Sequence, residues 1–516
     1  MYKKAIGASA IGFGGFTYMA DPKEYAYKRP IVFWGVLAPI FAHYKYVEYI
    51  TQDLSDEEQD IRFKALHVKY APKVLELFFN LRGLFVKLGQ VACSREDALP
   101  KEYRDVFKVL LDHAPSVKGK EAYDLVEKAL GRKIESVFSE FDSTPLGAAS
   151  IGQVHAGTLH DGTKVVIKIQ FPETKRTFDL DFMNGRFFSK IAKPDQLPFL
   201  DEFEKQFKLE FDFMREANNL QRVGNNIHPY FKQVRIPKPY LQYCTPTCVV
   251  MERFYGLKML DGFKYKMNQN ALKMGFKDMD EMKTSFNELQ QQSWYYYYPV
   301  VGYRSARFAL MSSIDKLKWI YNSTLGAIFP KFQFNKWDSI DATNIVDTIF
   351  KVHGHQIFKN GLFNGDPHID NIWLLNDNKI GLIDYGQVKE LDPTMIESIK
   401  LLYKGILENN VDKTVDAYIK MGYKSQLVSD LISSTPEQRQ LIFEKCILAY
   451  DKEDVTYFKK MNMIQYMEKL EKQDKTITIP KDIIMVMRTS FLLRGLGAML
   501  TGQRISTAQK WKDFID

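Results

Sequence analysis

The sequence predicts an α+β protein of two lobes, preceded by a helical N-terminal extension. One observation is the strand, turn and strand pattern from Pro145 to Phe171, which holds a lysine inside an apolar strand. Another is the stretch from Phe363 to Gly386, in which polar loops alternate with two short apolar strands. Long helical patterns precede the first stretch and follow the second. At 516 residues the chain has room for two or three domains or for one large two-lobed domain.

Composition and charge narrow the classes of function. The 45% apolar and 26% charged residues are ordinary for a globular protein. The net charge of +8 is spread along the chain, which indicates weak attraction to anionic lipid or nucleotide and argues against nucleic acid as a partner. The 4 cysteines are too few and too scattered for a disulfide framework. Cys244 and Cys248 lack a second ligand pair, so we expect core thiols rather than zinc ligands, in a reducing compartment.

Residues 1–50 differ from the rest of the chain. Lys3 and Lys4 precede a Gly-rich apolar run from Ala5 to Met19, and a second apolar run extends from Ile31 to Ala42. The first run lies near the lower length limit for a membrane span, and the second is shorter and holds a proline. We expect a membrane-associated segment. An organelle-targeting segment, which the acid-free start of the chain suits, and a hairpin that lies against a partner are the alternatives.

Residues 51–135 are predicted to form the helical extension. Ser55 and Glu58 have the spacing of a capping box at its start, and Gly131 suits a C-terminal cap. Lys87 and Gln90 share one helical face in the sequence K-L-G-Q. Taken alone, this motif is equally typical of a solvated helix end.

Residues 136–256 are predicted to form the smaller lobe. Lys168 lies in the apolar sequence V-V-I-K, a strand in which kinases place a lysine that contacts the α and β phosphates of the nucleotide. The loop before this strand lies where kinases cover the phosphates, and it consists of Gly147, Ala148, Ala149 and Ser150. Met251 lies near the end of a buried strand that is typical of the segment connecting two lobes.

A lysine inside an apolar strand is costly unless a carboxylate pairs with it. The expected partner is Glu216, on a predicted helix from Lys208 to Arg222. It shares one helical face with Asp212 and Asn219. The same charges would also fit an ordinary surface helix.

The chemistry is expected in the larger lobe, residues 257–516, which carries a predicted aromatic-rich insertion at about 265–337. Asp366 and Asn371 lie in one loop, and Asp384 follows an apolar strand. Phosphoryl transfer needs a carboxylate that orients the acceptor and oxygen ligands that hold Mg²⁺ against the phosphates. Asp366 suits the first role, and Asn371 and Asp384 suit the second. Because Asp and Asn are common in turns, a structural turn is the alternative.

Six motifs in this order resemble those of the UbiB/aarF-domain atypical kinase family. They are K-L-G-Q at 87–90, G-A-A-S at 147–150, V-V-I-K at 165–168, E-F-D-F-M-R-E-A-N-N at 210–219, D-P-H-I-D-N at 366–371 and D-Y-G at 384–386. The resemblance runs from about residue 55 to the C-terminus, and it is closest to the mitochondrial lipid-homeostasis branch. It implies a protein-kinase-like two-lobed fold with a helical extension that packs over the active site.

The same resemblance implies roles for particular residues. Lys87 and Gln90 would enter the nucleotide pocket, and Lys87 would pair with Glu210 and Asp212. The two alanines of the G-A-A-S loop would shape nucleotide selectivity. The implied cofactors are ATP, or ADP, and Mg²⁺, and the implied activity is that of an atypical kinase or ATPase that is poor at phosphorylating other proteins.

The resemblance also implies a setting. The expected partners are nucleotide, a membrane lipid or isoprenoid, and a membrane protein complex. The expected location is the mitochondrial inner membrane, where the protein would support lipid or coenzyme Q homeostasis.

The chain departs from the usual family loop, which reads H-A-D-P-H-P-G-N. Four of those positions are occupied here by Asn364, Gly365, Ile369 and Asp370. Asp370 adds a negative charge beside Asn371, which either assists a metal or disturbs its geometry.

Two other functions stay open. The loop also resembles that of aminoglycoside and choline kinase-like enzymes, which are small-molecule phosphotransferases. The N-terminal and aromatic segments suit instead a non-catalytic pseudokinase that serves as a structural subunit of a membrane complex.

Overall fold

The computed structural model describes most of the chain. The described residues are 22–93, 100–112, 116–148, 151–192, 200, 204, 207–290, 341–377, 379–428, 434–452 and 463–515. The first 21 residues, Ala149, Ser150 and most of the predicted insertion therefore lie outside the described residues. The chain divides into two compact units, of which the first holds Met1–Asn218 and Pro239–Arg253 and the second holds Asn219–Lys238 and Phe254–Asp516.

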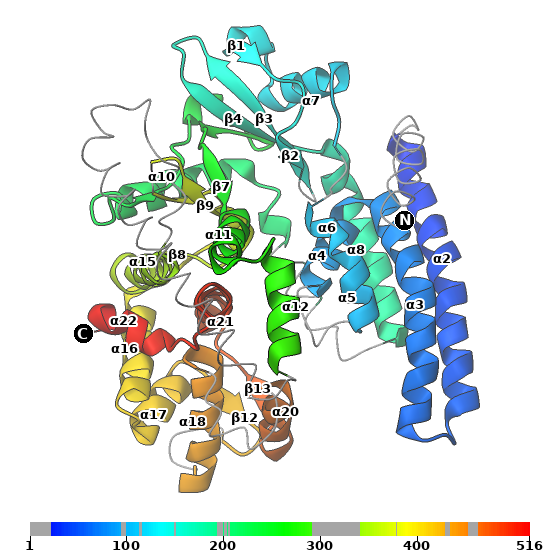
Figure 1. Cartoon of the computed structure of the whole chain (residues 1–516), viewed down its shortest axis with the longest axis vertical. Helices are drawn as coiled ribbons and strands as arrows, with labels where there is room; N and C mark the ends of the chain where they lie inside the picture. Colours follow the sequence, from blue (N-terminus) through cyan, green and yellow to red (C-terminus); the bar gives the residue numbers. More distant parts are fainter. Residues whose placement is uncertain are drawn as a thin grey trace. The chain divides into compact units, whose positions relative to one another are not determined.

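The first unit begins with helices. Helices α2 and α3 run side by side (Figure 1), and a capping box of Ser55 and Glu58 starts α3, as the spacing of these residues predicts. A left-handed Gly131 ends α7, again at the predicted position. The helices are α2 (Pro22–Thr51), α3 (Asp56–Leu81), α4 (Gly83–Cys93), α5 (Lys101–Phe107), α6 (Val109–Asp112), α7 (Lys120–Leu130) and α8 (Pro172–Ala192).

The sheet of the first unit is antiparallel, in the order β1-β3-β4-β6, with β2 paired to the edge of β3. Apolar side chains of α7 pack on β3, β4 and β6 to form its core. Gly162, at φ 84°, makes the predicted turn between β3 and β4. The strands are β1 (Phe138–Phe141), β2 (Gly147–Ala148), β3 (Gly152–Leu159), β4 (Lys164–Gln170) and β6 (Cys248–Glu252).

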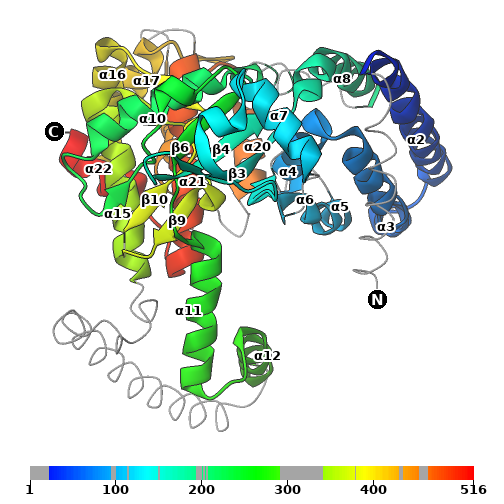
Figure 2. The ribbon, with the colours of Figure 1, turned by 90° about the horizontal axis from the view of Figure 1, so that it is seen from above.

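The second unit combines small sheets with a helical array. One sheet has the order β5-β10-β9-β7, and a two-stranded ribbon pairs β8 with β11, just before the loop that holds Asp366 and Asn371. Helix α11 extends away from these strands with α12 beside its far end (Figure 2). The strands are β5 (Val234–Arg235), β7 (Gly256–Lys258), β8 (Leu362–Asn364), β9 (Ile372–Leu375), β10 (Ile380–Leu382), β11 (Val388–Glu390), β12 (Lys424–Ser425) and β13 (Thr476–Thr478).

The helices of the second unit fill most of residues 341–515. Helix α10 (Phe213–Ile227) crosses the boundary between the units along the chain. The others are α11 (Met259–Met274), α12 (Met279–Gln290), α15 (Ala342–His355), α16 (Pro393–Leu407), α17 (Val411–Lys420), α18 (Pro436–Tyr450), α20 (Met463–Gln473), α21 (Lys481–Thr501) and α22 (Thr507–Ile515).

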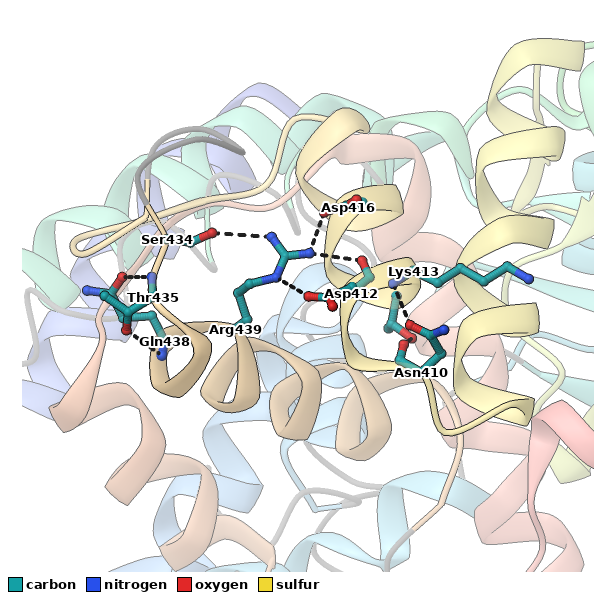
Figure 3. Close-up of polar contacts among 9 residues, drawn as sticks. Asn410, Asp412, Lys413, Asp416, Ser434, Thr435, Gln438 and Arg439 are labelled. Atoms are coloured by element: carbon teal, nitrogen blue, oxygen red, sulfur yellow. Dashed lines mark hydrogen bonds and ion pairs between the residues drawn. The ribbon is translucent and has the colours of Figure 1, made fainter.

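Polar contacts join α17 to α18 in this array (Figure 3). Arg439 of α18 donates from Nε to Asp412 Oδ1 at 2.6 Å, and its guanidinium also contacts Asp416 and Ser434. Side-chain caps at Asn410 and Thr435 start the two helices. This corner is therefore fixed by hydrogen bonds as well as by packing.

Within the described residues, Asp482–Thr501 of α21 is the one helical stretch whose length and hydropathy would allow it to cross a membrane. However, 56% of that stretch is buried inside the protein, and a core helix of a globular protein would have the same length and hydropathy. The predicted apolar run Ile31–Ala42 lies inside the longer helix α2.

Candidate functional site

The first cluster of site residues centres on Lys168, in the middle of strand β4. Its backbone is flanked by Val154 on β3 and Val249 on β6, so the lysine emerges from the centre of the sheet. Nζ of Lys168 lies 2.6 Å from Oε1 and 2.9 Å from Oε2 of Glu216. The glutamate side chain is only 4% exposed and the lysine side chain 18%. The lysine therefore neutralises a buried carboxylate and keeps part of its surface accessible.

Helix α10 positions Glu216 through its first turn. Of the predicted helix from Lys208, the first two residues are helical, but a turn follows and α10 begins at Phe213. Asp212 accepts a hydrogen bond from the backbone N–H of Arg215 at 3.0 Å and so caps this helix. The ring of Phe213 lies under the ammonium, with its centroid 5.3 Å from Lys168 Nζ. The cap, the aromatic ring and the carboxylate together fix the lysine.

The extension contributes Lys87 from α4. Its Nζ lies 3.1 Å from Oε1 of Glu210, which lies in the turn before α10. The Gln90 side chain donates to the carbonyl of Leu110 at 2.9 Å. A Cβ on Gly89 would lie 2.3 Å from Leu110 Cδ1, so packing within the extension requires this glycine. Among the residues that the resemblance assigned to this ion pair, Glu210 contacts Lys87 and Asp212 caps α10.

The phosphate-loop and hinge residues fall partly within the structure. Gly147 and Ala148 form β2, paired with Val154 and Gln153 of β3, while Ala149 and Ser150 lie outside the described residues. Met251 is 7% exposed and pairs with Val166 near the end of β6. The strand predicted at Thr247–Gly256 is thus β6 followed by the separate short strand β7.

The second cluster lies in the second unit, where Asn364 joins two loops. Its Nδ2 donates to the carbonyl of Asp384 at 2.9 Å, and its Oδ1 accepts from the backbone N–H of Asp366 at 2.9 Å. The backbone N–H of Asn364 donates to Gln356 Oε1 at 3.1 Å, and its carbonyl accepts from Thr489 at 3.3 Å. A single buried amide therefore sets the spacing between the Asp366 and Asp384 loops. No pattern in the sequence predicts this role of Asn364.

A backbone hydrogen bond brings the segments of the two proposed metal ligands, Asn371 and Asp384, together. The N–H of Ile383 donates to the carbonyl of Asn371 at 3.0 Å, which brings Asn371 beside the end of β10. Asp384 follows at once, and its Oδ1 accepts from Gly386 N–H at 3.0 Å. One amide and one carboxylate suit Mg²⁺, which usually takes few protein oxygens and completes its shell with water and phosphate. Groups of three or more His, Cys, Asp or Glu that would hold a metal unaided do not occur among the described residues.

Cys244 and Cys248 belong to the core of the first unit. Cys244 and Cys248 are buried and unbonded to each other, and burial raises the pKa of both thiols. They are core thiols, as their spacing predicts.

Comparison with known proteins decides the family. The model of the ABC1 atypical kinase-like domain matches residues 109–290 and 326–418, more than half of the chain. The chain belongs to the ABC1/UbiB atypical kinase family. This family holds atypical kinase-like proteins, and the chain has the two-lobed α+β fold with a helical N-terminal segment that its motifs predict.

Curated ABC1 relatives are distant and longer than the matched regions. The chain is 26% identical over 441 residues to the chloroplastic Protein ACTIVITY OF BC1 COMPLEX KINASE 8 of Arabidopsis thaliana, a match that covers 82% of this chain and 47% of that protein. AarF domain-containing protein kinase 1 of Xenopus laevis is 32% identical over 44% of each chain. Probable protein kinase UbiB of Pseudomonas fluorescens strain Pf-5 is 34% identical over 35% of each. The matches thus span less than half the length of these relatives.

A solved structure of the Rv3197–erythromycin complex from Mycobacterium tuberculosis also aligns, at 19% identity. The alignment covers 86% of this chain and 94% of that one with a TM-score of 0.44, a likeness too distant to bear on function.

The structure shows two contacts of the loop from Asp366 to Asn371. Arg488 of α21 lies 3.1 Å from Asp366 Oδ1 and donates to Gln387 Oε1 at 2.8 Å, so it links the Asp366 loop to the residue that precedes β11. Asp370 Oδ2 lies 3.2 Å from Nδ1 of His368, and this contact lowers the pKa of Asp370 despite its partial burial. The extra carboxylate that Asp370 adds to the family loop therefore has His368 as a partner in the same turn.

Proposed function

We propose that this ABC1 protein binds ATP or ADP with Mg²⁺ and acts as an atypical kinase or ATPase. The observation that supports it best is the contact of Lys168 with the buried carboxylate of Glu216. Apolar side chains at these positions would stabilise the strand at least as well as a buried ion pair does. A buried ion pair in such a strand is therefore typical of a functional centre. In this proposal Lys168 binds the α and β phosphates of the nucleotide.

The second unit would supply the remaining chemistry. Asn371 and Asp384 would hold Mg²⁺, which screens the charge of the phosphates, and Asp366 would orient the acceptor hydroxyl or water. Gly147, Ala148, Ala149 and Ser150 would cover the phosphates, and Met251 would border the base. Lys87, Gln90, Glu210 and Asp212 would restrict access for protein substrates, in keeping with the motifs of the family.

The test compares two lysines of the same strand. Lys168→Met should abolish the rise in melting temperature that Mg²⁺ and ATP produce, and Glu216→Gln should weaken it. Lys164→Met is the matched control, because Lys164 lies on β4 and pairs with Glu140 at the surface, where the side chains are 50% and 70% exposed. Since such surface pairs contribute about 0–1 kcal/mol, this control should bind nucleotide as the unchanged protein does. If Lys168→Met binds Mg²⁺ and ATP normally, the proposed site is wrong.

A non-catalytic role is the second candidate, and the contact between Arg488 and Asp366 favours it. A guanidinium that occupies one carboxylate oxygen competes with an acceptor hydroxyl for the same atom. In that case the protein would bind nucleotide as a structural subunit of a membrane complex. Turnover of ATP by the purified protein, lost on Asp384→Asn, would exclude this role.

The proposed setting is the mitochondrial inner membrane, with a role in lipid or coenzyme Q homeostasis. Its support is the acid-free start of the chain, the apolar runs within residues 1–50 and the resemblance of the motifs. Carbonate extraction of isolated mitochondria tests the location. A protein recovered entirely outside mitochondria would contradict it.

A further inference from the structure

Helices α2 and α8 pack against each other within the first unit. Arg29 of α2 donates from Nε to Asp181 Oδ1 of α8 at 2.8 Å, and both side chains are almost completely buried. One helical turn further, the Trp34 indole donates to Asn184 at 3.1 Å. The ring of Phe188 lies against those of Phe33, Trp34 and Phe41. The two helices therefore form one fixed surface.

The solvent side of this pair is apolar. On α2, Ile31 is 72% exposed, and on α8, Met183 and Phe187 are 61% and 57% exposed. The ring of Trp34 lies 5.6 Å from that of Phe187, so the exposed stripes of the two helices are continuous. We call this surface the α2–α8 face, and its exposed members are Ile31, Val32, Gly35, Ala38, Pro39 and Ala42 of α2 and Met183, Phe187 and Ile191 of α8.

On α2, charge is confined to the margins of the face, while on α8 the exposed Lys190 lies between Phe187 and Ile191. Between the exposed Lys28 and Lys45, the one Lys, Arg, Asp or Glu of α2 is Arg29, which is buried against α8. Just beyond Lys45, Tyr46 and Tyr49 are 60% and 70% exposed. Lysines and tyrosines at the edge of an apolar surface are the usual anchors at the boundary between lipid and water.

The length of the face limits what it can contact. From Ile31 to Ala42 the helix rises about 17 Å at 1.5 Å per residue. This is roughly half of the 30 Å hydrocarbon core of a bilayer, so the face suits one leaflet rather than a complete span. An exposed apolar surface of this kind on a single chain marks an interaction site.

We propose that the α2–α8 face inserts into one leaflet of a lipid bilayer. This inference rests on the membrane part of the proposed function and names the surface that makes the contact. A bilayer is favoured over a protein partner because the six exposed α2 residues of the face present no side-chain hydrogen-bonding group, whereas protein interfaces are about as polar as the rest of the surface. The chain before α2 also carries no charged residue from Ala5 to Ala20. The apolar surface thus continues a segment that is itself predicted to be membrane-associated.

The experiment uses the full chain with one environment-sensitive fluorophore at a time. After Cys93→Ser, the label is attached at Ile31→Cys or Phe187→Cys, and at Ile477→Cys as the control, because Ile477 is 67% exposed on β13 in the second unit. Vesicles of phosphatidylcholine, with and without phosphatidylglycerol, carry lipids brominated along the acyl chain as quenchers. The native thiols Cys244, Cys248 and Cys446 are buried and should not react.

We expect both face labels to shift to the blue and to be quenched by the brominated chains, while the Ile477 label stays in water. Ile31→Asp and Phe187→Asp should each lower the vesicle partition coefficient roughly tenfold, and Ile477→Asp should not change it. Binding that increases with phosphatidylglycerol would assign the anchoring lysines to anionic headgroups.

Three results would overturn the proposal, and they can be told apart. If the protein binds vesicles but the labels at positions 31 and 187 remain in water, another segment makes the contact and only the assigned face is wrong. If the protein does not bind vesicles, membrane association itself fails. Burial of the labels only when a protein complex is added would make the face a protein interface instead. Nucleotide binding, measured in the same samples, is independent of all three outcomes.

Discussion

Asn364 is the residue on which the geometry of the second cluster depends most directly. Its amide donates to the carbonyl of Asp384 and accepts from the N–H of Asp366, both at 2.9 Å. The side chain is buried, at 5% exposure, so solvent is poorly placed to replace both contacts. Asn364→Ala should therefore separate two loops that carry the proposed acceptor-orienting and metal-binding carboxylates.

The size of the effect follows from these two hydrogen bonds. Leaving a buried donor or acceptor without a partner costs about 1–3 kcal/mol, and both partners here are only partly buried, which favours the lower part of that range. Asn364→Ala should thus destabilise the loops by about 2–3 kcal/mol. Asn364→His, the residue usual in the family, can keep the donor to Asp384 and should cost about half as much. Asn364→Asp would place a carboxylate oxygen against that carbonyl and should cost more than alanine.

Hydrogen exchange of the peptides that cover residues 362–390 measures the local loss of stability in these loops. A local measurement is needed because a chain of two compact units has no single unfolding free energy. A loss of 2–3 kcal/mol corresponds to exchange that is about 30-fold to 150-fold faster. The Mg²⁺ dependence of ATP binding should weaken in Asn364→Ala and be partly restored in Asn364→His. Asn376→Ala, in the exposed turn between β9 and β10, is the control. If Asn364→Ala exchanges and binds as the unchanged protein does, the amide does not set the loop geometry.

Three further predictions follow from buried or paired charges. Asp181→Ala should destabilise the first unit by about 3–5 kcal/mol, because it leaves the guanidinium of Arg29 buried without its carboxylate. Asp179→Ala, on the exposed side of the same helix, is the control and should change stability little. Equal melting temperatures of the two variants would refute this prediction. Burial lowers the pKa of His353 from 6.5 to about 4, so the unfolded chain binds a proton that the folded one excludes. Stability should therefore fall as pH drops from about 6.5 to 4, by at most about 1.4 kcal/mol per pH unit, and His353→Gln should reduce that slope in chemical denaturation at stepped pH. Arg488→Met should leave the dissociation constant for Mg²⁺ and ATP nearly unchanged but raise ATP turnover about tenfold, because the guanidinium no longer competes with an acceptor for Asp366 Oδ1. Unchanged turnover in this variant would show that the contact does not limit access to Asp366.

Local patterns in the sequence anticipated much of the fold. The strand that holds Lys168, the turn at Gly162 and the caps at Ser55 and Gly131 each depend on neighbouring residues, and each is present. The contact with Glu216 was also accessible, because a lysine inside an apolar strand requires a carboxylate and the next helix offers one. These features could be predicted because each is determined by residues that lie close together in the sequence.

Contacts that depend on tertiary structure were not accessible in this way. Arg488 lies 122 positions after Asp366 on a largely apolar helix, and Arg29 lies 152 positions before Asp181. Asn364 looks like an ordinary turn residue, since nothing in its neighbourhood predicts two partners 2 and 20 residues away. The start of α10 was placed too early for a related reason, because only the structure shows that Asp212 serves as its cap.

The two lysines of β4 show why burial, more than pairing, separates a candidate site from surface chemistry. Lys164 and Lys168 lie on the same side of the strand, four residues apart, and each contacts a glutamate. At the strand end both partners are half or more exposed, so solvent screens the pair and its loss costs little. At the strand centre Glu216 is withdrawn from water, and the desolvation of its charge is offset only while the lysine stays in place. Apolar side chains would fill the same volume without this cost, so stability alone does not account for the pair. We propose that the pair is kept because a fixed positive charge is needed at that point for phosphate binding.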